Sequence, residues 1–275
     1  MIDGTVDGGG HAAAIMDRIM PNGSFLGVDW DEAMIRKRIA ERKDPDRERY
    51  VRGNYADLPA ILAQEQLPKA DGLLLDLGFS SEQLEQSGRG FSFGESSRNE
   101  PLLMTYDSSR RSVAEIIREE DESSLADIIY QFGGERRSRA IAKAIKRAGK
   151  KKRVVTSGEL ADAIRSALPK NYEHGRIDPA TRTFQALRIY ANGELENLSR
   201  MIDGLKDVVR PGGRVAIMSF HSLEDRIVKQ KFQQSAKEGK LKLLTKKPIG
   251  ASSDEIAENP RSRSAKLRAA VLLSI

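Results

Sequence analysis

The sequence predicts an α/β fold in which helices cover a mostly parallel sheet, and three observations support this prediction. Short apolar runs alternate with helical stretches through the first third of the chain, a pattern typical of strands joined by crossover helices. Each apolar run ends in an acidic or polar cluster. From about Ser112 to Leu168 the periodicity is helical without a convincing strand, and a pattern of strands and helices resumes before the C-terminus.

The first third contains the expected strands and helices in alternation. A short apolar start leads through a glycine-rich turn into an Ala-rich helical run over 12–20. The apolar run at 72–75 is typical of a strand buried on both faces. The other elements expected in this part are strands at 24–28 and 50–52 and helices at 32–42 and 57–66.

The middle of the chain indicates a helical insert. Ser112 with Glu115 and Ser124 with Asp127 resemble helix starts, and Thr156 with Glu159 has the pattern of a capping box. After it we expect a helix over 183–209, a strand over 214–220, a helix opening at 221–225, and strands at 241–245 and 267–275. The expected domains are a core in two parts, 1–106 and 182–275, and an inserted helical domain at 107–181.

Composition limits the classes of protein that the chain can belong to. The 275 residues include no cysteine, which excludes disulfides and thiolate metal ligands. The three histidines lie far apart in the sequence, so we expect no zinc site. We find no membrane-spanning run and no leader peptide, and we expect a cytoplasmic protein. The net charge of +6 favours a polyanionic partner, although a basic, soluble surface needs none.

The glycine-rich turn is the first candidate ligand site. Residues 4–10 contain four glycines in seven positions, between the apolar start and the first helix. Such a turn lets backbone approach a nucleotide-like cofactor, and the N-terminus of the next helix suits a carboxylate or phosphate. Taken alone, the same composition also fits a plain flexible terminus.

Two acids at strand ends extend this candidate site. Asp29 lies about 20 residues after the turn, where a carboxylate can accept hydrogen bonds from both ribose hydroxyls. Nicotinamide cofactors and S-adenosylmethionine both contain adenosine, so this spacing does not distinguish them. Asp76 ends the fourth strand, where it could hold an amino group while Phe79 stacks on a flat ring. The structural alternative for either acid is a helix cap.

Basic residues gather in two segments. Ten of the eighteen residues at 136–153 are Lys or Arg, and several recur at helical spacing. A second basic set occupies 259–268, before the last strand. Most charge runs are solvated faces, but this density favours contact with phosphates, and we expect neutralisation of Lys150 to Arg153 to weaken that contact.

Several longer sequence motifs occur in order along essentially the whole chain. They are GGH at 9–11, LDLG at 75–78 with Ser80, Ser81 and Gln83, RGFSF at 89–93, PATRTFQALRI at 179–189, SFHSLEDR at 219–226, and NPR at 259–261 with Arg263 and Ser264. Together they resemble the bacterial ribosomal RNA small subunit methyltransferase H family, also called MraW.

This resemblance implies a Rossmann-like class I S-adenosylmethionine-dependent methyltransferase with an inserted helical, RNA-binding domain. Members transfer a methyl group to the exocyclic N4 of one cytidine in 16S ribosomal RNA, near the ribosomal P site. The partner it implies is 16S ribosomal RNA or the small ribosomal subunit, with monomer and homodimer both open. By motif, the cofactor contacts are Gly9, Gly10, His11, Asp29, Tyr55, Asp76 and Gln83, and Asp76 is also the catalytic candidate. The RNA contacts are Phe79, Arg182, His221, Arg226, Arg261 and Arg263.

The chain departs from the family pattern at several positions. Asp7 stands where the family has a glycine. The segment before the glycine turn is short, so either the start is misassigned or the central strand is stunted. Asp178, Leu103 and Phe79 also replace the usual residues. These departures leave open a catalytically impaired relative that binds RNA or assembling subunits. An NAD-dependent oxidoreductase is less favoured because no paired base and cation for hydride transfer follow the fourth strand.

Overall fold

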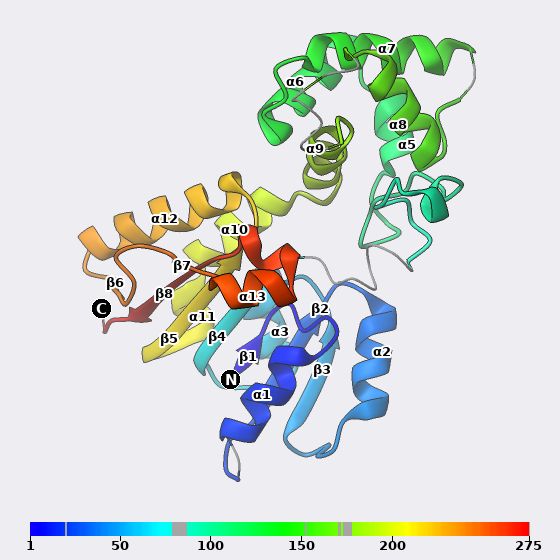
Figure 1. The fold of residues 1–275 in the computed structure, drawn as a ribbon. Helices are drawn as coiled ribbons and strands as arrows, with labels where there is room; N and C mark the ends of the chain where they lie inside the picture. The colour runs from blue at the N-terminus through cyan, green and yellow to red at the C-terminus, as the bar shows by residue number, and fades with distance from the viewer. Residues whose placement is uncertain (20, 79–86, 152, 170–171, 173–177, 275) are drawn as a thin grey trace. The chain divides into compact units, whose positions relative to one another are not determined.

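The computed structural model describes residues 1–19, 21–78, 87–151, 153–169, 172 and 178–274 (Figure 1). The chain divides into two compact units. The first unit consists of Met1–Gly78 and Leu195–Ile275, and the second of Phe79–Glu194. Within the described residues, no helix combines the length and the apolar character needed to cross a membrane.

One mixed sheet forms the centre of the first unit, with strand order β3-β2-β1-β4-β5-β8-β6 and β7 paired to β8. Neighbouring strands from β3 to β5 are parallel, and β8 is antiparallel to β5, β6 and β7. The strands are β1 (Ile2–Asp3), β2 (Phe25–Asp29), β3 (Glu48–Arg52), β4 (Ala70–Asp76), β5 (Val209–Ser219), β6 (Leu241–Leu243), β7 (Ile249–Gly250) and β8 (Lys266–Leu272). The chain order therefore reverses between β1 and β4, which is where open α/β sheets bind ligands.

Alternation along the strands divides the core of this unit between the two faces of the sheet. On β2, Leu26 and Val28 belong to the large apolar cluster, whereas Phe25 belongs to a smaller one. On β4, Leu73 and Leu75 are fully buried in the large cluster. Because side chains alternate along a strand, these assignments place the two clusters on opposite faces.

Helices cover both faces of the sheet (Figure 1). The smaller cluster includes Ala12 of α1 (Gly10–Ile19) and Ile35 of α2 (Glu32–Glu41). The large cluster includes apolar residues of α3 (Leu58–Gln64), α10 (Glu194–Asp203), α11 (Leu205–Val208) and α12 (Ser222–Lys237). The short helices η1 (Tyr55–Asp57), α13 (Ser253–Glu258) and η4 (Pro260–Ser264) complete this unit. The sheet is thus covered on both sides, as buried parallel strands require.

The second unit is helical in its described residues. It contains η2 (Glu95–Ser97), α5 (Val113–Glu119), α6 (Glu122–Gly133), α7 (Ser138–Lys151), α8 (Ser157–Ser166) and α9 (Thr181–Asn192) around one apolar cluster. Thr156 forms the predicted capping box of α8, and Ser112, predicted as a helix start, caps α5, also in a capping box. The expected start at Ser124 is wrong, because Asp121 caps α6 and its carboxylate accepts the Ser124 N–H at 2.7 Å.

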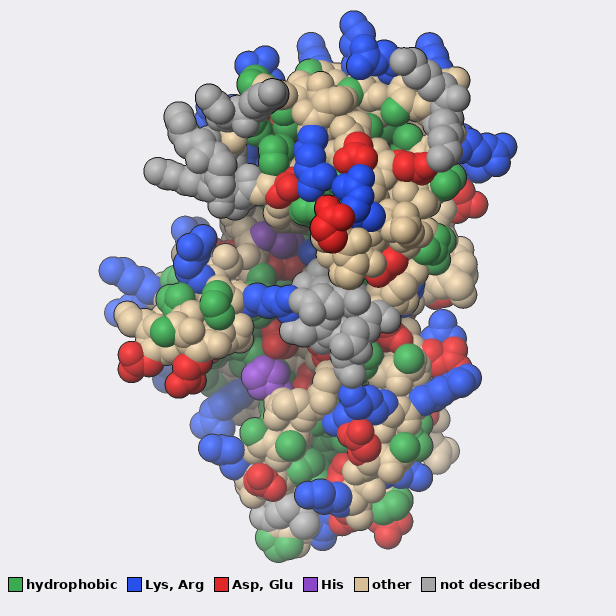
Figure 2. Space-filling model, turned by 45° about the vertical axis from the view of Figure 1, so that its right-hand side comes forward, with side chains coloured by type: hydrophobic (Ala, Val, Ile, Leu, Met, Phe, Trp, Pro, Cys, Tyr) green, Lys and Arg blue, Asp and Glu red, His purple; other side chains and the backbone are tan. Residues whose placement is uncertain are grey.

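Helix α7 is the main basic feature of the second unit. Ile141 and Ile145 are fully buried in the apolar cluster. The exposed cations on this helix are Arg139, Lys143, Arg147 and Lys150. Figure 2 shows Lys and Arg side chains along the edge of the surface where α7 lies in Figure 1. The helix is thus amphipathic, with one face in the core and a solvated, cationic face.

Several expected boundaries differ from those of the structure. The helix expected over 183–209 is three helices, because Gly193 ends α9 with φ 61° and Gly204 precedes α11. The second unit has the bounds Phe79–Glu194 in place of the expected 107–181. Leu102 and Met104, outside the expected insert, are buried in its apolar cluster. Packing of the flanking segments into the helical core explains the wider bounds.

Candidate functional site

The glycine-rich loop between β1 and α1 hydrogen bonds to both neighbouring strands. Gly4 N donates to Leu74 O at 2.9 Å, and Val6 N donates to Val28 O at 3.0 Å. A Cβ added at Gly4 would lie 2.5 Å from Leu75 Cδ2, so only glycine fits there without rearrangement. Gly9 has φ +83°, a left-handed conformation that glycine adopts without strain. The loop therefore lies in the sheet at the position where the strand order reverses.

The open side of the same loop faces free space. A Cβ added at Gly8 or Gly10 would meet no heavy atom within 4 Å. Gly10 begins α1, a ten-residue helix whose first N–H groups have no partners within the helix. Close packing on one side and free space on the other are what a backbone surface for a ligand requires.

Asp29 ends β2 and is almost completely buried. Its carboxylate accepts the Asp7 N–H at 3.0 Å and the Asp31 N–H at 2.8 Å, one on each oxygen. Burial, with the nearby charges of Asp7 and Asp31 adding to it, raises the pKa of Asp29 to about 7 despite these two hydrogen bonds. Each oxygen retains a lone pair, so the carboxylate can accept two further donors.

Asp76 ends β4 and is hydrogen bonded to the glycine-rich loop. Its backbone N–H donates to Thr5 Oγ1 at 2.6 Å, and its Oδ2 lies 3.2 Å from His11 Nε2 at the start of α1. The hydrogen bond to Asp76 is the main reason that the pKa of His11 is raised. As pH rises through that raised pKa the imidazolium loses its charge, and the ion pair with Asp76 is lost.

Asp3 is a third acid at this edge, and it was not predicted from the sequence. It ends β1 and pairs in register with Gly27 and Leu74, between β2 and β4. Its side chain is fully buried, and burial raises its pKa to about 6. Its position at a strand end could have identified it. Asp3, Asp29 and Asp76 each end one of three adjacent parallel strands. The carboxyl edge of the sheet is therefore acidic.

Tyr55 lies beside the loop at the start of η1. Asn54 caps this turn by accepting the Ala56 N–H at 2.9 Å, and its amide donates to Asn197 of α10 at 3.0 Å. Tyr55 packs against the large apolar cluster, and its Cβ lies 3.1 Å from the position of a Cβ added at Gly4. The other predicted residues after the fourth strand, Phe79 and Gln83, lie outside the described residues.

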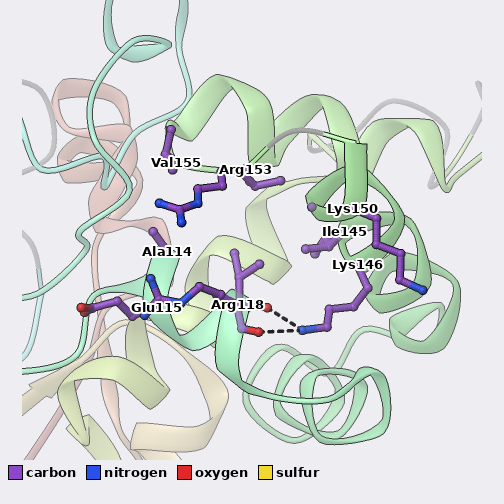
Figure 3. Close-up of a pocket in the computed structure, with 11 residues that line it drawn as sticks. Ala114, Glu115, Arg118, Ile145, Lys146, Lys150, Arg153 and Val155 are labelled. Atoms are coloured by element: carbon purple, nitrogen blue, oxygen red, sulfur yellow. Dashed lines mark hydrogen bonds between the residues drawn. The ribbon is translucent and has the colours of Figure 1, made fainter.

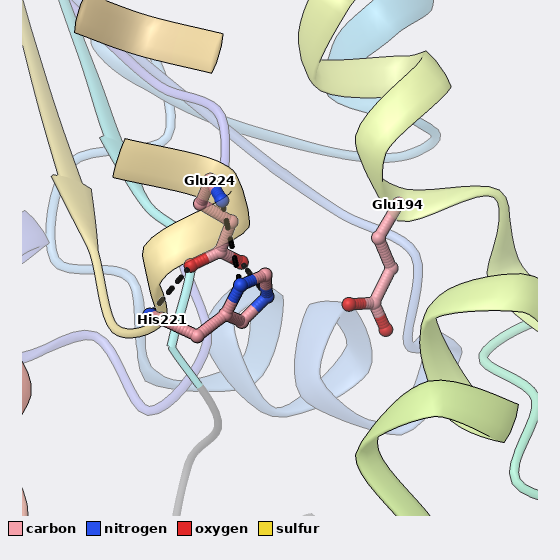
Figure 4. Close-up of side chains that lie close together, drawn as sticks. All are labelled: Glu194, His221 and Glu224. Carbon is pink, nitrogen blue, oxygen red and sulfur yellow. Dashed lines mark hydrogen bonds and ion pairs between the residues drawn. The ribbon is translucent and has the colours of Figure 1, made fainter. Parts of the chain in front are cut away.

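His221 caps α12 at the end of β5 (Figure 4). Its Nδ1 accepts the Glu224 N–H at 3.4 Å, and its Nε2 lies 3.1 Å from Glu224 Oε1. The other Glu224 oxygen accepts the Phe220 N–H at 2.9 Å. Phe220 in turn closes the space beside Gly78, where an added Cβ would lie 2.7 Å from its ring. The structure thus gives His221 a structural role as the N-cap of α12.

The predicted RNA-contacting arginines occur in both units. Arg226 lies on α12, and Arg261 and Arg263 lie on η4; all three are exposed and belong to the first unit. Arg182 lies on α9 of the second unit, with Nη1 3.7 Å from the buried Glu135 carboxylate. Each unit therefore carries exposed or partly exposed cations of its own.

The parallel order β3-β2-β1-β4-β5, the antiparallel β8 and the acids at the point of reversal define the class of the protein. It has a Rossmann-like fold of the class I S-adenosylmethionine-dependent methyltransferases with an inserted helical unit. More particularly, the chain belongs to the MraW methylase family, whose family model matches residues 1–272. The resemblance inferred from the sequence motifs is thereby confirmed.

Similar proteins cover nearly the whole chain. The chain is 43% identical over 288 residues to the ribosomal RNA small subunit methyltransferase H of Syntrophus aciditrophicus (strain SB), covering 98% of this chain and 90% of that protein. It is 45% identical over 268 residues to the protein of the same name from Coprothermobacter proteolyticus, covering 97% and 87%. A third, from Sorangium cellulosum, is 44% identical over 274 residues, covering 98% and 83%.

Proposed function

We propose that this protein uses S-adenosylmethionine to methylate the exocyclic N4 of a cytidine in 16S ribosomal RNA, close to the ribosomal P site, in the cytoplasm. The observation that carries the proposal is the arrangement of Asp29, the glycine-rich loop and Asp76 along one edge of the sheet. Its relatives at 40–45% identity are named as ribosomal RNA small subunit methyltransferases, which supports an RNA substrate.

The residues of the loop edge fit the parts of S-adenosylmethionine. Asp29 accepts the ribose hydroxyls, since each of its oxygens retains a lone pair. The N–H groups at the start of α1, from Gly10 and His11, face the amino acid carboxylate. Gly9 supplies the left-handed turn of the loop beside Arg38, Gly8 and Gly10 leave free space for the cofactor, and Tyr55 packs next to Gly4. Gln83 is proposed as a further contact on the strength of its motif.

Asp76 is proposed to position the acceptor amine. When bound, the cofactor supplies an electrophilic methyl group on a sulfonium, which needs an in-line approach of the nucleophile and little acid or base help. The cytosine N4 lone pair is delocalised into the ring. A carboxylate that accepts a hydrogen bond from the amino group favours the pyramidal geometry that the attack requires. His11 holds that carboxylate in place through its hydrogen bond to Oδ2.

RNA phosphates are proposed to contact the exposed cations of both units. These are the basic face of α7 and Arg182 in the second unit, and Arg226, Arg261 and Arg263 in the first. Phe79 is proposed to stack on the target base. His221 is proposed to act through the cap of α12, near Arg226, more than by direct contact with RNA.

The proposed reaction is tested by incubating the protein with labelled S-adenosylmethionine and either free 16S ribosomal RNA or purified small subunits. The RNA is digested to nucleosides, and mass spectrometry distinguishes N4-methylcytidine from ring-methylated cytidine. We expect N4-methylcytidine at one position. A methyl group on another atom would overturn the proposed chemistry. Binding of cofactor and RNA without transfer would favour the catalytically impaired relative.

Asp7 is the residue that favours this second candidate. It has φ 41°, a left-handed conformation unusual for a residue with a side chain, and its charge adds to the raised pKa of Asp29. We expect Asp7→Asn and Asp7→Gly each to tighten S-adenosylmethionine binding by about fivefold, because both remove a charge beside the ribose-binding carboxylate.

Calorimetry at pH 7 measures this effect. Asn tolerates the left-handed conformation at least as well as Asp, so Asp7→Asn removes the charge without adding backbone strain. Equal gains in the two variants indicate the charge, and a gain in Asp7→Gly alone indicates the strain. Unchanged affinity in both variants would show that Asp7 has no influence on the cofactor site.

A further inference from the structure

A cavity of about 300 Å³ lies entirely within the second unit, between α5, α7 and the segment 153–155 (Figure 3). Its walls are largely apolar and come from Ala114, Ile117, Ile145, Val154 and Val155. Ile117, Ile145 and Val154 are buried, whereas Val155 is exposed at the edge of the cavity. A volume of this size is at the lower end of the range for small-molecule sites.

Four cations line the same cavity, and they are not equivalent. Lys146 is committed to the fold, because its ammonium donates to the carbonyls of Ile117 at 2.8 Å and Arg118 at 3.2 Å at the end of α5. Arg118 pairs with Glu119 at 2.8 Å. For Lys150 and Arg153, no carboxylate of the described residues lies within ion-pair distance.

The acid in the lining does not neutralise these cations. The Glu115 carboxylate accepts the Ser112 N–H at 2.7 Å and the Ser112 hydroxyl at 2.8 Å in the capping box of α5. Those hydrogen bonds hold the pKa of Glu115 below its usual value, so it stays ionised at its own cap. In Figure 3, Arg153 extends on the side of Ala114 and Val155, while Lys150 comes from α7 on the other side. The Arg153 guanidinium and the Lys150 ammonium thus lie on different sides of the cavity, and an anionic group on the side of Ala114 and Val155 would meet Arg153.

A stripe of cations on α7 leads to the cavity. Arg139, Lys143, Arg147 and Lys150 are exposed, and their spacing of four, four and three residues places them on one face of the helix. At a rise of 1.5 Å per residue, the stripe is roughly 16 Å long. No carboxylate of the described residues pairs with these four cations, and a row of such cations suits a polymer with repeated phosphates better than a single small anion.

We propose that this cavity holds one unstacked nucleotide of the RNA, with its base between the apolar walls and its phosphate on Arg153. The inference rests on the proposed RNA substrate, and it adds a nucleotide site that is separate from the methyl-transfer residues of the first unit. No aromatic side chain of the described residues lines the cavity, so the base is held by shape and apolar contact rather than by stacking. The selection among bases is accordingly modest.

Gly149 allows the cavity to be filled without strain. It lies in α7 at the cavity lining, and a Cβ added there would meet no heavy atom within 4 Å. Gly149→Leu places an apolar side chain at the cavity, and Gly149→Ala is the matched control for the gain in helix propensity. Arg153→Ala removes the proposed phosphate contact. Lys143→Ala is its control, because it also removes one positive charge but Lys143 does not line the cavity.

Binding is measured with full-length protein by fluorescence anisotropy of a single-stranded 16S ribosomal RNA fragment, and by NMR titration with cytidine monophosphate and with inorganic phosphate. We expect Gly149→Leu to weaken RNA binding about tenfold and to abolish the shifts caused by the mononucleotide, with Gly149→Ala close to the wild type. Arg153→Ala is expected to lose the mononucleotide response, whereas Lys143→Ala weakens RNA binding but retains that response. Thermal unfolding confirms that each variant is folded.

Two outcomes separate this inference from the proposed function. If Gly149→Leu binds RNA and cytidine monophosphate as Gly149→Ala does, the nucleotide site is refuted, even where the wild type methylates the RNA. If the wild type transfers no methyl group but Gly149→Leu still loses the mononucleotide response, the proposed function fails and the nucleotide site stands. If inorganic phosphate and cytidine monophosphate cause equal NMR shifts in all variants, the site binds only phosphate. That result would refute the proposed binding of a base.

Discussion

Replacing Asp76 with asparagine is expected to reduce the rate of methyl transfer by about 10²- to 10³-fold, the usual effect of removing one group that stabilises a transition state. Asn is nearly the same size and retains an oxygen that can accept the Gly78 N–H, which lies 3.4 Å from Asp76 Oδ1. It lacks the negative charge that pairs with His11 and that is proposed to hold the amine. Single-turnover transfer to small subunits, with saturating cofactor and RNA, measures the chemical step.

His11→Gln is the matched control for Asp76. Gln can donate a hydrogen bond toward Asp76 but carries no charge, so we expect a smaller loss, within about tenfold. Cofactor affinity measured by calorimetry separates positioning of the amine from binding of the cofactor. A rate for Asp76→Asn within threefold of the wild type would remove Asp76 from the mechanism.

The affinity for S-adenosylmethionine is expected to increase as pH rises through about 7, and Asp29→Asn is expected to weaken it about 10- to 100-fold at pH 8. Burial raises the pKa of Asp29 to about 7 in the protein without ligand. In the proposed complex the ribose hydroxyls donate to the ionised form, so binding below pH 7 would first release a proton from Asp29. Affinity then falls by up to about tenfold for each pH unit below the pKa.

Calorimetry from pH 5.5 to 8.5 in two buffers of different ionisation enthalpy measures both the affinity and the proton released. The Asp29→Asn variant should lose the change in affinity centred near pH 7 and keep any contributions of Asp3 and His11, whose pKa values are also raised. A wild-type profile equal to that of the variant would contradict the assignment of Asp29 to the ribose. Asp76→Asn is a useful second control, because it should retain the pH dependence that arises from Asp29.

The same raised pKa values act on folding with a definite sign. Asp3, with a pKa of about 6, and Asp29, with a pKa of about 7, bind protons more tightly in the folded than in the unfolded chain. Their contribution to stability is full below the ordinary carboxyl pKa of about 4 and is lost as pH rises through 6 to 7. The protein without cofactor is thus weakened in the pH range where the cofactor binds best.

The sequence predicted the sheet better than the boundaries of the units. Strands at 24–28, 50–52 and 72–75 overlap β2, β3 and β4, because buried apolar runs with polar ends are a local signal. Asp29 and Asp76 could be placed at strand ends for the same reason. The division at Phe79 and Glu194 depends on contacts between distant segments, such as Leu102 and Met104 with the helical core, which no local pattern reveals.

Other features of the site were missed for different physical reasons. Asp3 was overlooked because a two-residue strand carries almost no periodicity, although its position at the end of a central strand matches that of Asp29. The hydrogen bond between His11 and Asp76 joins residues 65 positions apart and follows only from the parallel order of β1 and β4. The proposed roles of these residues remain predictions that the variants above address.

The shortness of β1 has a consequence for how ligand binding and folding are linked. Only Ile2 and Asp3 form this central strand, and the hydrogen bonds from Gly4 to Leu74 and from Val6 to Val28 continue it into the glycine-rich loop. The backbone that would contact the cofactor therefore also joins β2 to β4. Cofactor binding to this loop should therefore stabilise the pairing of β2 and β4 with the central strand. Amide protons of Leu26 and Val28 should then exchange with solvent more slowly when cofactor is present.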